Sequence, residues 1–308
     1  MHIIDLHCDV LDKLTRLENS DFIQDDRLHA SFERLKKGNV KVQVFAIFIH
    51  PRIPQHLKFQ EALKQVEAFY QKVLQVPDVI HITDWKQIDQ LKEGQIGAVL
   101  SLEGLDAIGD DLEKLLVLLN AGVKLVGLTW NYENTVAYGA LEDPRKGLKS
   151  FAKQVIQILN ERDIIVDVAH LNEQGFYDIL GKAKHLIASH SNSRALCDHT
   201  RNLTDEQLRT LVAHGGRIHV VFYPPFIEEN SKSTTVERLM EHIIFLKNIV
   251  GIENVGLGSD FDGIDLFVEN LTNAEDFPNL IRELQNRLSD EEVELIAWKG
   301  FKNFVDQI

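Results

Sequence analysis

Residues 3–9 read Ile-Ile-Asp-Leu-His-Cys-Asp, a short apolar run that ends in a His-x-Asp pair. In a β-strand, residues two positions apart point to the same face of the sheet. We therefore expect His7 and Asp9 to project side by side and to offer one nitrogen and one oxygen donor, a combination that suits divalent zinc. Cys8 should point to the opposite face and pack in the core. A single His-x-Asp at a strand end is usually ordinary structure, so its weight depends on what recurs along the chain.

Apolar segments of strand character recur after this first one, separated by helical patterns. Strands are predicted at residues 41–49, 96–102, 123–129, 164–169, 186–189, 217–222 and 255–258. Helices are predicted at residues 59–76, 85–92, 111–120, 148–161, 173–180, 204–213, 236–250, 277–287 and 290–304. The sequence Thr-Asp-Glu-Gln from residue 204 is a capping box, and Gly122 fits a left-handed helix cap. Residues 10–37 are charged and mixed in pattern, and no element is assigned to them.

The alternation of strands and helices indicates the fold class. It is typical of βαβ units and of a parallel α/β sheet. Eight such units in a chain of 308 residues fit a (β/α)8 TIM barrel better than an open, doubly wound sheet. The length would also allow two domains, but no linker or composition break interrupts the pattern. We expect one domain over residues 1–308.

Composition excludes several classes of function. With 44% hydrophobic residues and a net charge of −14, the chain has a globular composition and little affinity for nucleic-acid backbones or anionic membranes. Cys8 and Cys197 are the two cysteines, too few for a disulfide framework, which fits a reducing compartment. The N-terminus lacks a basic, then apolar, leader pattern, and no stretch approaches the roughly 18 apolar residues of a membrane helix. We expect a cytoplasmic protein without nucleic-acid or membrane partners.

Six side chains of metal-binding or acid–base type each stand at the carboxyl end of a predicted strand. They are His7, Asp9, Glu103, His170, His190 and Asp260. In a barrel these strand ends converge on one mouth, where active sites are built. Each residue alone has an ordinary explanation, such as a helix-dipole carboxylate for Glu103. Chance is a poor explanation for all six at the same mouth.

Three histidines and three carboxylates are the mixture found in a two-metal hydrolytic site. A bridging carboxylate can hold two ions about 3.5–4 Å apart, and the ions together bring the pKa of bound water close to 7. Glu103 is the natural bridge, because its strand lies between the two groups of ligands. Five ligands then leave Asp260 free to move protons.

Taken in order, the motifs of the chain resemble those of the membrane (renal-type) dipeptidases, binuclear zinc peptidases of family M19 in the amidohydrolase superfamily. The resemblance spans nearly the whole chain, and the motifs are specific only in combination. They are DLHCD (5–9), LEG (102–104), LTWN (128–131), DVAH (167–170), SHS (189–191) followed by RN (201–202), GG (215–216) leading to FY (222–223), and GSDFDG (258–263). The resemblance implies a barrel of the metal-dependent hydrolase type.

The same resemblance implies a metal centre with two Zn²⁺ ions per chain. His7, Asp9 and Glu103 would hold one ion. Glu103, His170 and His190 would hold the other, so that Glu103 bridges the pair. This assignment matches the set of strand-end residues.

Roles for the remaining residues also follow from the resemblance. Asp260 corresponds to the carboxylate thought to act as general acid/base, and Arg201 to the arginine that binds the free carboxylate of the substrate. Without the family, Arg201 would be interpreted as a solvated surface charge. Tyr223 falls where the family has a tyrosine that contacts substrate, although Tyr-Pro-Pro at residues 223–225 equally fits a structural turn.

The chain departs from the family pattern after the strand at 123–129. Many members carry Thr-His there, with the histidine helping to stabilise the tetrahedral intermediate, whereas this chain has Trp130 followed by Asn131. An indole N–H can donate one hydrogen bond but cannot carry positive charge. The oxyanion would then depend on zinc, on Asn131 or on a main-chain N–H. Trp130 equally fits an apolar wall of the pocket.

The predicted function is a binuclear zinc dipeptidase that hydrolyses dipeptides with a free C-terminal carboxylate. A hydroxide bridging the two ions would attack the scissile carbonyl, and Asp260 would deliver the proton to the leaving amine. Two alternatives stay open: another binuclear hydrolase acting on lactones, phosphotriesters or N-acyl amino acids, or a metal-binding barrel without turnover. Family members are commonly dimers, which extends the expectation to a homodimer, although no stretch of the sequence marks a dimer surface.

Overall fold

The computed structural model describes residues 1–308 and is organised around one closed sheet of parallel strands. The barrel strands are β1 (Ile3–Cys8), β2 (Val40–Phe48), β4 (Ile96–Glu103), β5 (Val123–Gly127), β6 (Ile165–Asp167), β7 (Leu186–Ala188), β8 (Arg217–Val220) and β10 (Val255–Leu257). The ring closes because β1 pairs with β10 and β2 pairs with β4. This confirms the predicted (β/α)8 barrel and excludes an open, doubly wound sheet.

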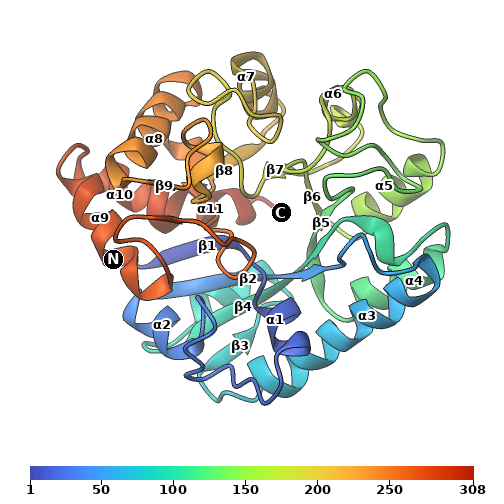
Figure 1. The fold of residues 1–308 in the computed structure, drawn as a ribbon, viewed down its shortest axis with the longest axis horizontal. Coiled ribbons are helices and arrows are strands. Elements are labelled where there is room, and N and C mark those ends of the chain that lie inside the picture. The colour runs from blue at the N-terminus through green and yellow to red at the C-terminus, as the bar shows by residue number, and fades with distance from the viewer.

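Helices surround the barrel, as Figure 1 shows. They are α1 (Val10–Arg16), α2 (Phe32–Lys37), α3 (Gln55–Ala68), α4 (Leu112–Asn120), α5 (Ala152–Glu161), α6 (Glu173–Ile179), α7 (Asp205–Ala213), α8 (Val236–Val250), α9 (Phe277–Gln285), α10 (Asp290–Glu294) and α11 (Gly300–Val305). None of them is long and apolar enough to cross a membrane. Each segment predicted as a barrel strand forms one, so the alternating pattern was a reliable guide to the architecture.

Some elements depart from the predicted pattern. Helices α1 and α2 lie in the charged segment that gave no expectation. A short strand, β3 (Val79–His81), extends the sheet beside β4, and β9 (Ser233–Thr234) pairs with β11 (Phe267–Val268) in a separate small sheet. The stretch predicted as one helix at 290–304 is divided by a π-helical turn, η7 (Leu295–Lys299).

Two predicted caps are present. The Thr204 hydroxyl accepts the Gln207 N–H at 3.2 Å, and the Gln207 side chain accepts the Thr204 N–H at 2.9 Å. Gly122 has φ +94°, and a Cβ there would collide with the His81 ring. Glycine is required at this position because both the backbone conformation and the close approach exclude a side chain.

The apolar core has two layers. The inner layer lies inside the barrel and takes residues from β1, β2, β4, β5, β6 and β7; it is closed at one end by α11 and by the 3₁₀ helix η2 (Trp85–Gln90). Its members are Ile4, Leu6, Val42, Val44, Ile82, Trp85, Ile88, Val99, Leu125, Ile165, Ile187, Phe301 and Val305. The outer layer joins the strands to the surrounding helices and includes Cys8, which is fully buried as predicted. Because α11 fills one end of the barrel, the opposite mouth is left for polar side chains.

Candidate metal centre

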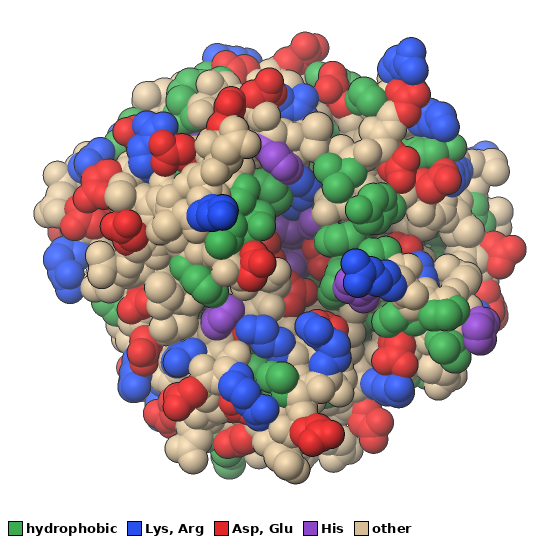
Figure 2. Space-filling model, viewed as in Figure 1, with side chains coloured by type: hydrophobic (Ala, Val, Ile, Leu, Met, Phe, Trp, Pro, Cys, Tyr) green, Lys and Arg blue, Asp and Glu red, His purple; other side chains and the backbone are tan.

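Six side chains that follow barrel strands meet at the carboxyl-terminal mouth. They are His7 and Asp9 from β1 and its end, Glu103 at the end of β4, His170 after β6, His190 after β7 and Asp260 after β10. None of these side chains is more than 16% exposed. Figure 2 shows a hollow near the centre of this face, with histidine and acidic side chains at its floor. The convergence predicted from the strand ends is therefore present.

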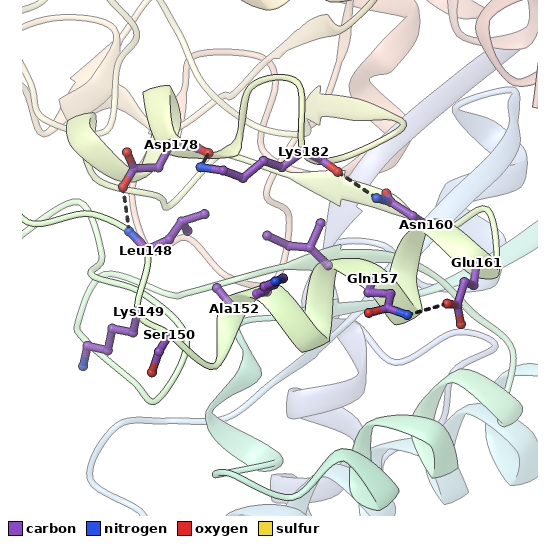
Figure 3. A pocket seen from close by; sticks show the side chains of 11 residues that line it. Leu148, Lys149, Ser150, Ala152, Gln157, Asn160, Glu161, Asp178 and Lys182 are labelled. Carbon is purple, nitrogen blue, oxygen red and sulfur yellow. Dashed lines mark hydrogen bonds between the residues drawn. The ribbon is translucent and has the colours of Figure 1, made fainter.

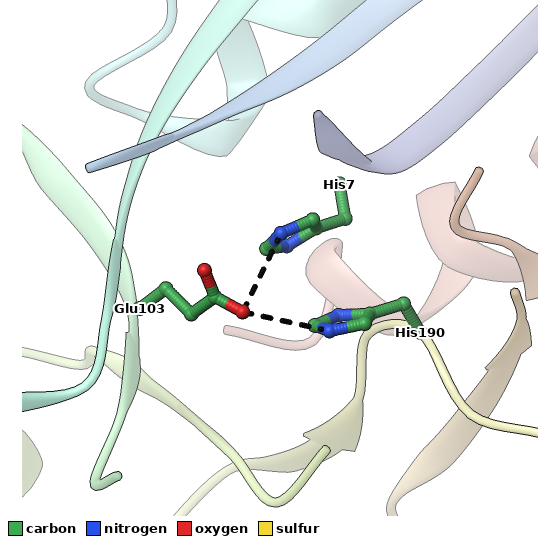
Figure 4. A group of neighbouring side chains, drawn as sticks. All are labelled: His7, Glu103 and His190. Atoms are coloured by element: carbon green, nitrogen blue, oxygen red, sulfur yellow. Dashed lines mark ion pairs between the residues drawn. The ribbon is translucent and has the colours of Figure 1, made fainter. Parts of the chain in front are cut away.

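The carboxylate of Glu103 lies at the centre of the group. Its Oε1 is 2.7 Å from His170 Nε2, 3.7 Å from His190 Nε2 and 3.8 Å from His7 Nε2. Figure 4 shows the His7 and His190 rings pointing at this oxygen from two sides. One carboxylate oxygen surrounded by three imidazole nitrogens is the arrangement expected of a bridging metal ligand.

A second part of the site lies on the other side of His7. The Nε2 of His7 is 3.4 Å from Asp9 Oδ2 and 3.9 Å from Asp260 Oδ1. Both His7 Nε2 and Asp9 Oδ1 are buried without a hydrogen-bond partner. A buried polar atom without a partner costs about 1–3 kcal/mol, so these two atoms fit a bound cation better than an empty core.

Hydrogen bonds from outside the group fix two of the imidazole rings. Asn131 Oδ1 is 2.8 Å from His170 Nδ1, and an amide oxygen can only accept, so His170 carries its proton on Nδ1. Ser189 Oγ donates to Asp167 and lies 2.7 Å from His190 Nδ1, which therefore also carries a proton. The two Nε2 lone pairs then face each other at 2.8 Å. Such a contact is repulsive unless a cation lies between the nitrogens, as in metal sites with oriented histidines.

The electrostatics of the site also favour added positive charge. Burial lowers the pKa of His170 and His190 well below the usual range, so both rings are neutral. Burial raises the pKa of Glu103 well above its usual range. Burial alone would lower the pKa of His7, but the carboxylates of Glu103 and Asp9 raise it to about 10. The raised pKa values of Glu103 and His7 mean that bound protons balance part of the negative charge of the buried carboxylates. Bound cations would balance more of it.

Asp260 stands on a loop with unusual backbone geometry. Its φ is +65° and that of Asp262 is +71°, both in the left-handed region. The Asp262 carboxylate accepts the N–H groups of His29 and Ala30 at 2.8 and 3.0 Å and pairs with Lys13 at 3.0 Å. Left-handed conformations at residues other than glycine are costly and occur where the surroundings enforce them, often at functional sites.

Arg201 lies beneath the mouth rather than on the surface. It is 2% exposed, and its Nη2 donates to His170 Nε2 at 3.1 Å and to the His190 carbonyl at 3.2 Å. Its Nε is buried without a partner, and the guanidinium lies 5.5 Å from the centre of the Phe226 ring. Burial lowers the pKa of Arg201 to about 10, so the side chain stays charged. The interpretation as a solvated surface charge is therefore excluded.

The mouth forms a cavity of about 400 Å³ above these residues. Trp130 lines it, with its ring 5.2 Å from that of Phe48 and 5.6 Å from that of Tyr132, in an aromatic wall. Tyr223 lines another part, with its hydroxyl 3.5 Å from Asp265 Oδ1. Asp262 and Gly263, from the GSDFDG motif, also line it. Sequence patterns gave no sign of several other lining residues: Asp12, Arg16, Phe48, His50, Phe226, Ile264 and Asp265.

A second and larger cavity, of about 850 Å³, lies away from the mouth along α5 (Figure 3). Polar groups in it bond to one another: Asn160 Nδ2 donates to the Lys182 carbonyl at 2.7 Å, and Gln157 donates to Glu161 at 2.9 Å. None of its lining residues has a buried polar atom without a partner. This cavity therefore offers a ligand no buried polar atom that lacks a partner.

Comparison with known proteins agrees with this geometry. Residues 1–307 match the family described as "Membrane dipeptidase (Peptidase family M19)". An uncharacterised dipeptidase of Schizosaccharomyces pombe is 29% identical over 300 residues, covering 91% of this chain and 72% of the relative. A dipeptidase of Aspergillus oryzae is 27% identical over 286 residues, covering 87% and 67%.

Solved structures show the same fold. A metallo peptidase of Rhodobacter sphaeroides, liganded with a phosphinate mimic of the dipeptide L-Ala-D-Ala, matches with a TM-score of 0.91 at 22% identity, covering 99% of each chain. The probable dipeptidase PvdM of Pseudomonas aeruginosa matches with a TM-score of 0.89 at 20% identity, covering 99% of this chain and 94% of the other. The resemblance noted in the sequence is therefore confirmed. The chain belongs to the membrane dipeptidase family, peptidase family M19, and is a metal-dependent dipeptidase by class.

Proposed function

We propose that residues 1–308 act as one binuclear zinc hydrolase domain that cleaves dipeptides bearing a free C-terminal carboxylate. The observation that carries this proposal is the buried Glu103 Oε1 with the Nε2 atoms of His7, His170 and His190 within 3.8 Å of it. Structural histidines are normally satisfied by backbone or water, whereas these three ring nitrogens face one carboxylate oxygen.

His7, Asp9 and Glu103 would hold one zinc ion, and Glu103, His170 and His190 the other. The mixture of imidazole and carboxylate ligands suits zinc. His7 Nε2 and Asp9 Oδ1 are buried without a hydrogen-bond partner, which supports a bound ion at the first of these two positions. When bound, the two ions would lower the pKa of water and polarise the scissile carbonyl.

Asp260 is the proposed acid/base group. Burial raises the pKa of its carboxyl to about 7. A group whose pKa lies near the working pH can both take up and release a proton during the reaction. Its Oδ1 lies 3.9 Å from His7 Nε2, and the residue lines the cavity. Asp260 would take the proton from the attacking water and pass it to the leaving amine.

Arg201 is the proposed partner of the substrate carboxylate. Its Nη2 donates to His170 Nε2, and a nitrogen that ligates a metal has no lone pair left to accept this bond. This N–H of Nη2 and the unpartnered N–H of Nε would then be available to bind a carboxylate with two parallel hydrogen bonds, while Nη2 keeps its bond to the His190 carbonyl. Such a contact would restrict cleavage to short peptides with a free C-terminus.

Trp130, Asn131 and Tyr223 complete the proposed substrate surface. The aromatic contacts of Trp130 favour the role of an apolar wall for a substrate side chain. Asn131 lines the cavity while its Oδ1 holds His170, so its amide N–H₂ is the part that could reach substrate. Tyr223 faces the cavity from the opposite loop with Phe226 4.9 Å behind its ring.

The test is metal content by plasma mass spectrometry, measured beside hydrolysis of L-L and L-D dipeptides. We expect about two zinc ions per chain and cleavage that a chelator abolishes and zinc restores. Matched C-terminally amidated dipeptides should be poor substrates, and a lactone, a phosphotriester and an N-acyl amino acid serve as competing substrate classes. Preference for one of these over every dipeptide, or the absence of tightly bound metal, would overturn the proposal.

A further inference from the structure

Two aspartates outside the proposed ligand set, Asp5 (buried) and Asp167 (partly buried), make the same pair of hydrogen bonds to a serine that follows the neighbouring strand. Asp5 accepts the Ser259 N–H at 2.7 Å and the Ser259 hydroxyl at 2.7 Å. Asp167 accepts the Ser189 N–H at 2.9 Å and, through its other oxygen, the Ser189 hydroxyl. We refer to these as the Asp5–Ser259 clamp and the Asp167–Ser189 clamp.

The two clamps have the same register although they lie on different strand pairs. Asp5 stands opposite Leu257 in the β1–β10 pair, and its serine is two residues further on. Asp167 stands opposite Ile187 in the β6–β7 pair, and its serine is again two residues further on. Both serines lie just beyond the last paired residue of their strand.

Each clamped serine immediately precedes a residue of the site. Ser189 is followed by His190, and Ser259 by Asp260. Holding the serine backbone on a carboxylate of the neighbouring strand therefore fixes the chain at the point where a functional side chain leaves it. A carboxylate that bonds the neighbour of a ligand acts on the site without touching a metal or a substrate.

Beyond this shared part, the two serine hydroxyls do different things. Ser189 Oγ lies 2.7 Å from His190 Nδ1, so it orients the ring and keeps the proton on Nδ1. Ser259 Oγ accepts the Phe261 N–H at 3.1 Å, lies 3.2 Å from the backbone carbonyl oxygen of His7, and makes no hydrogen bond with the Asp260 side chain. It braces the backbone on both sides of Asp260, whose φ of +65° an L-residue rarely adopts unless held.

We propose that the same Asp–Ser device serves two separate tasks in this chain. The Asp167–Ser189 clamp positions His190 for metal binding, and the Asp5–Ser259 clamp positions Asp260 for proton transfer. Asp5, Asp167, Ser189 and Ser259 are thus positioning residues. The inference rests on the proposed function, because it takes His190 as a metal ligand and Asp260 as the acid/base group.

The test compares Ser189→Ala with Ser259→Ala, each of which removes one hydroxyl and keeps the backbone N–H. Ser189→Ala should weaken zinc affinity by about 10–100-fold, the usual effect of losing a partner of a metal-binding histidine, measured by competition with a chromophoric chelator. Turnover of this variant at saturating zinc should approach that of the wild type. Ser259→Ala should bind zinc as tightly as the wild type while its kcat falls about 10–100-fold at nearly unchanged KM.

Ser101→Ala is the matched control, because this buried strand serine donates only to the Phe45 carbonyl, at 3.3 Å. It should leave zinc affinity and kcat unchanged. Circular dichroism and thermal unfolding of the metal-free proteins establish that all three variants fold. Should a serine variant fail to fold, Asp167→Asn or Asp5→Asn tests the same clamp from its other side.

Two results would overturn the inference: equal effects of Ser189→Ala and Ser259→Ala on zinc affinity, or loss of thermal stability alone with affinity and kcat intact. Failure of the proposed function gives a different pattern. A wild-type protein that binds zinc without cleaving dipeptides would refute the dipeptidase, whereas the zinc affinities of the two variants would still separate the clamps.

Discussion

The two ends of the barrel both bury histidine and arginine, and they use them in opposite ways. At the closed end, His219 Nδ1 donates to the Ala188 carbonyl at 3.0 Å, and its ring meets Phe301 edge-on at 5.7 Å. Arg217 donates to the carbonyls of Glu253 and Val255. At the mouth, three imidazole nitrogens point instead at Glu103. A buried histidine indicates a metal site when its ring nitrogen faces other potential metal ligands. It indicates a structural role when its ring faces the backbone and apolar rings.

Glu103→Gln should break the mouth most completely. The amide removes the charge that the three imidazole nitrogens share, so both ions lose their common ligand. Zinc content should fall to below one ion per chain, and turnover should drop by at least about 10⁴-fold. The unfolding temperature of metal-free Glu103→Gln should be no lower than that of the metal-free wild type, because the variant no longer buries a carboxylate. Retention of two ions would contradict the bridging role.

Asp260→Asn should separate metal binding from proton transfer. We expect unchanged zinc content and a fall in kcat of about 10²–10⁴-fold, the range for loss of a general acid/base. Zinc analysis and steady-state kinetics on the same preparation provide the check. Full activity of Asp260→Asn would show that another group moves the proton.

Arg201→Ala should affect recognition more than chemistry. Loss of hydrogen bonds to a charged carboxylate costs about 1.5–3 kcal/mol, so KM for dipeptides should rise roughly 10–100-fold. The same substitution should change KM for amidated dipeptides little, since they lack the charge. An equal rise in KM for both substrate sets would contradict the proposal that Arg201 binds the substrate carboxylate. Arg201→Lys, which keeps the charge but not the fork, should be intermediate.

His219→Gln should sharpen the comparison from the closed end and give the smallest effect. Burial lowers the pKa of His219 to about 3, while an unfolded histidine titrates near 6.5. The unfolded chain therefore takes up a proton that the folded chain refuses, so this contribution to stability is present above pH 6.5 and is lost as the pH falls towards 3.

Between pH 7 and pH 5 the loss from this one group is about 2 kcal/mol. Urea unfolding of the metal-free protein at both pH values measures it, and the His219→Gln variant should show a correspondingly smaller difference. Dipeptidase kinetics of this variant at pH 7 should match the wild type, because the His219 side chain is not part of the cavity lining. An unchanged pH dependence would mean that His219 is protonated in the folded state.

The fold was predictable because apolar strand segments alternate regularly with helical ones. Helices α1 and α2 were not, because tertiary contacts stabilise this charged segment. One such contact is the Asp262 carboxylate, which accepts the His29 and Ala30 N–H groups from a position 233 and 232 residues away. Local periodicity carries no information about partners at that distance.

The site was predictable to the extent that strand ends define it. The convergence of His7, Glu103 and His190 is confirmed by their distances, while their roles as ligands stay predictions. Trp130, Asn131 and Tyr223 were suggested for the pocket and do line the cavity, but the rest of its wall and the hydrogen-bonded partners depend on lateral neighbours that the sequence does not show. The contact of Asn131 with His170 is an example: the sequence suggested Asn131 for the oxyanion but could not show what it touches.

The pairing of β1 with β10 has a consequence for the order in which the enzyme becomes complete. Asp5 and Ser259 are hydrogen-bonded although 254 residues separate them in the sequence. The first strand to be synthesised therefore finds its β10 partner only when nearly the whole chain has been made. At synthesis rates of about 5–20 residues per second, roughly 10–50 s separate the emergence of His7 from that of Asp260. The other four side chains of the site emerge within that interval, before β10 can pair with β1 and close the barrel. The mouth at which these side chains converge is therefore assembled only after nearly the whole chain has been made.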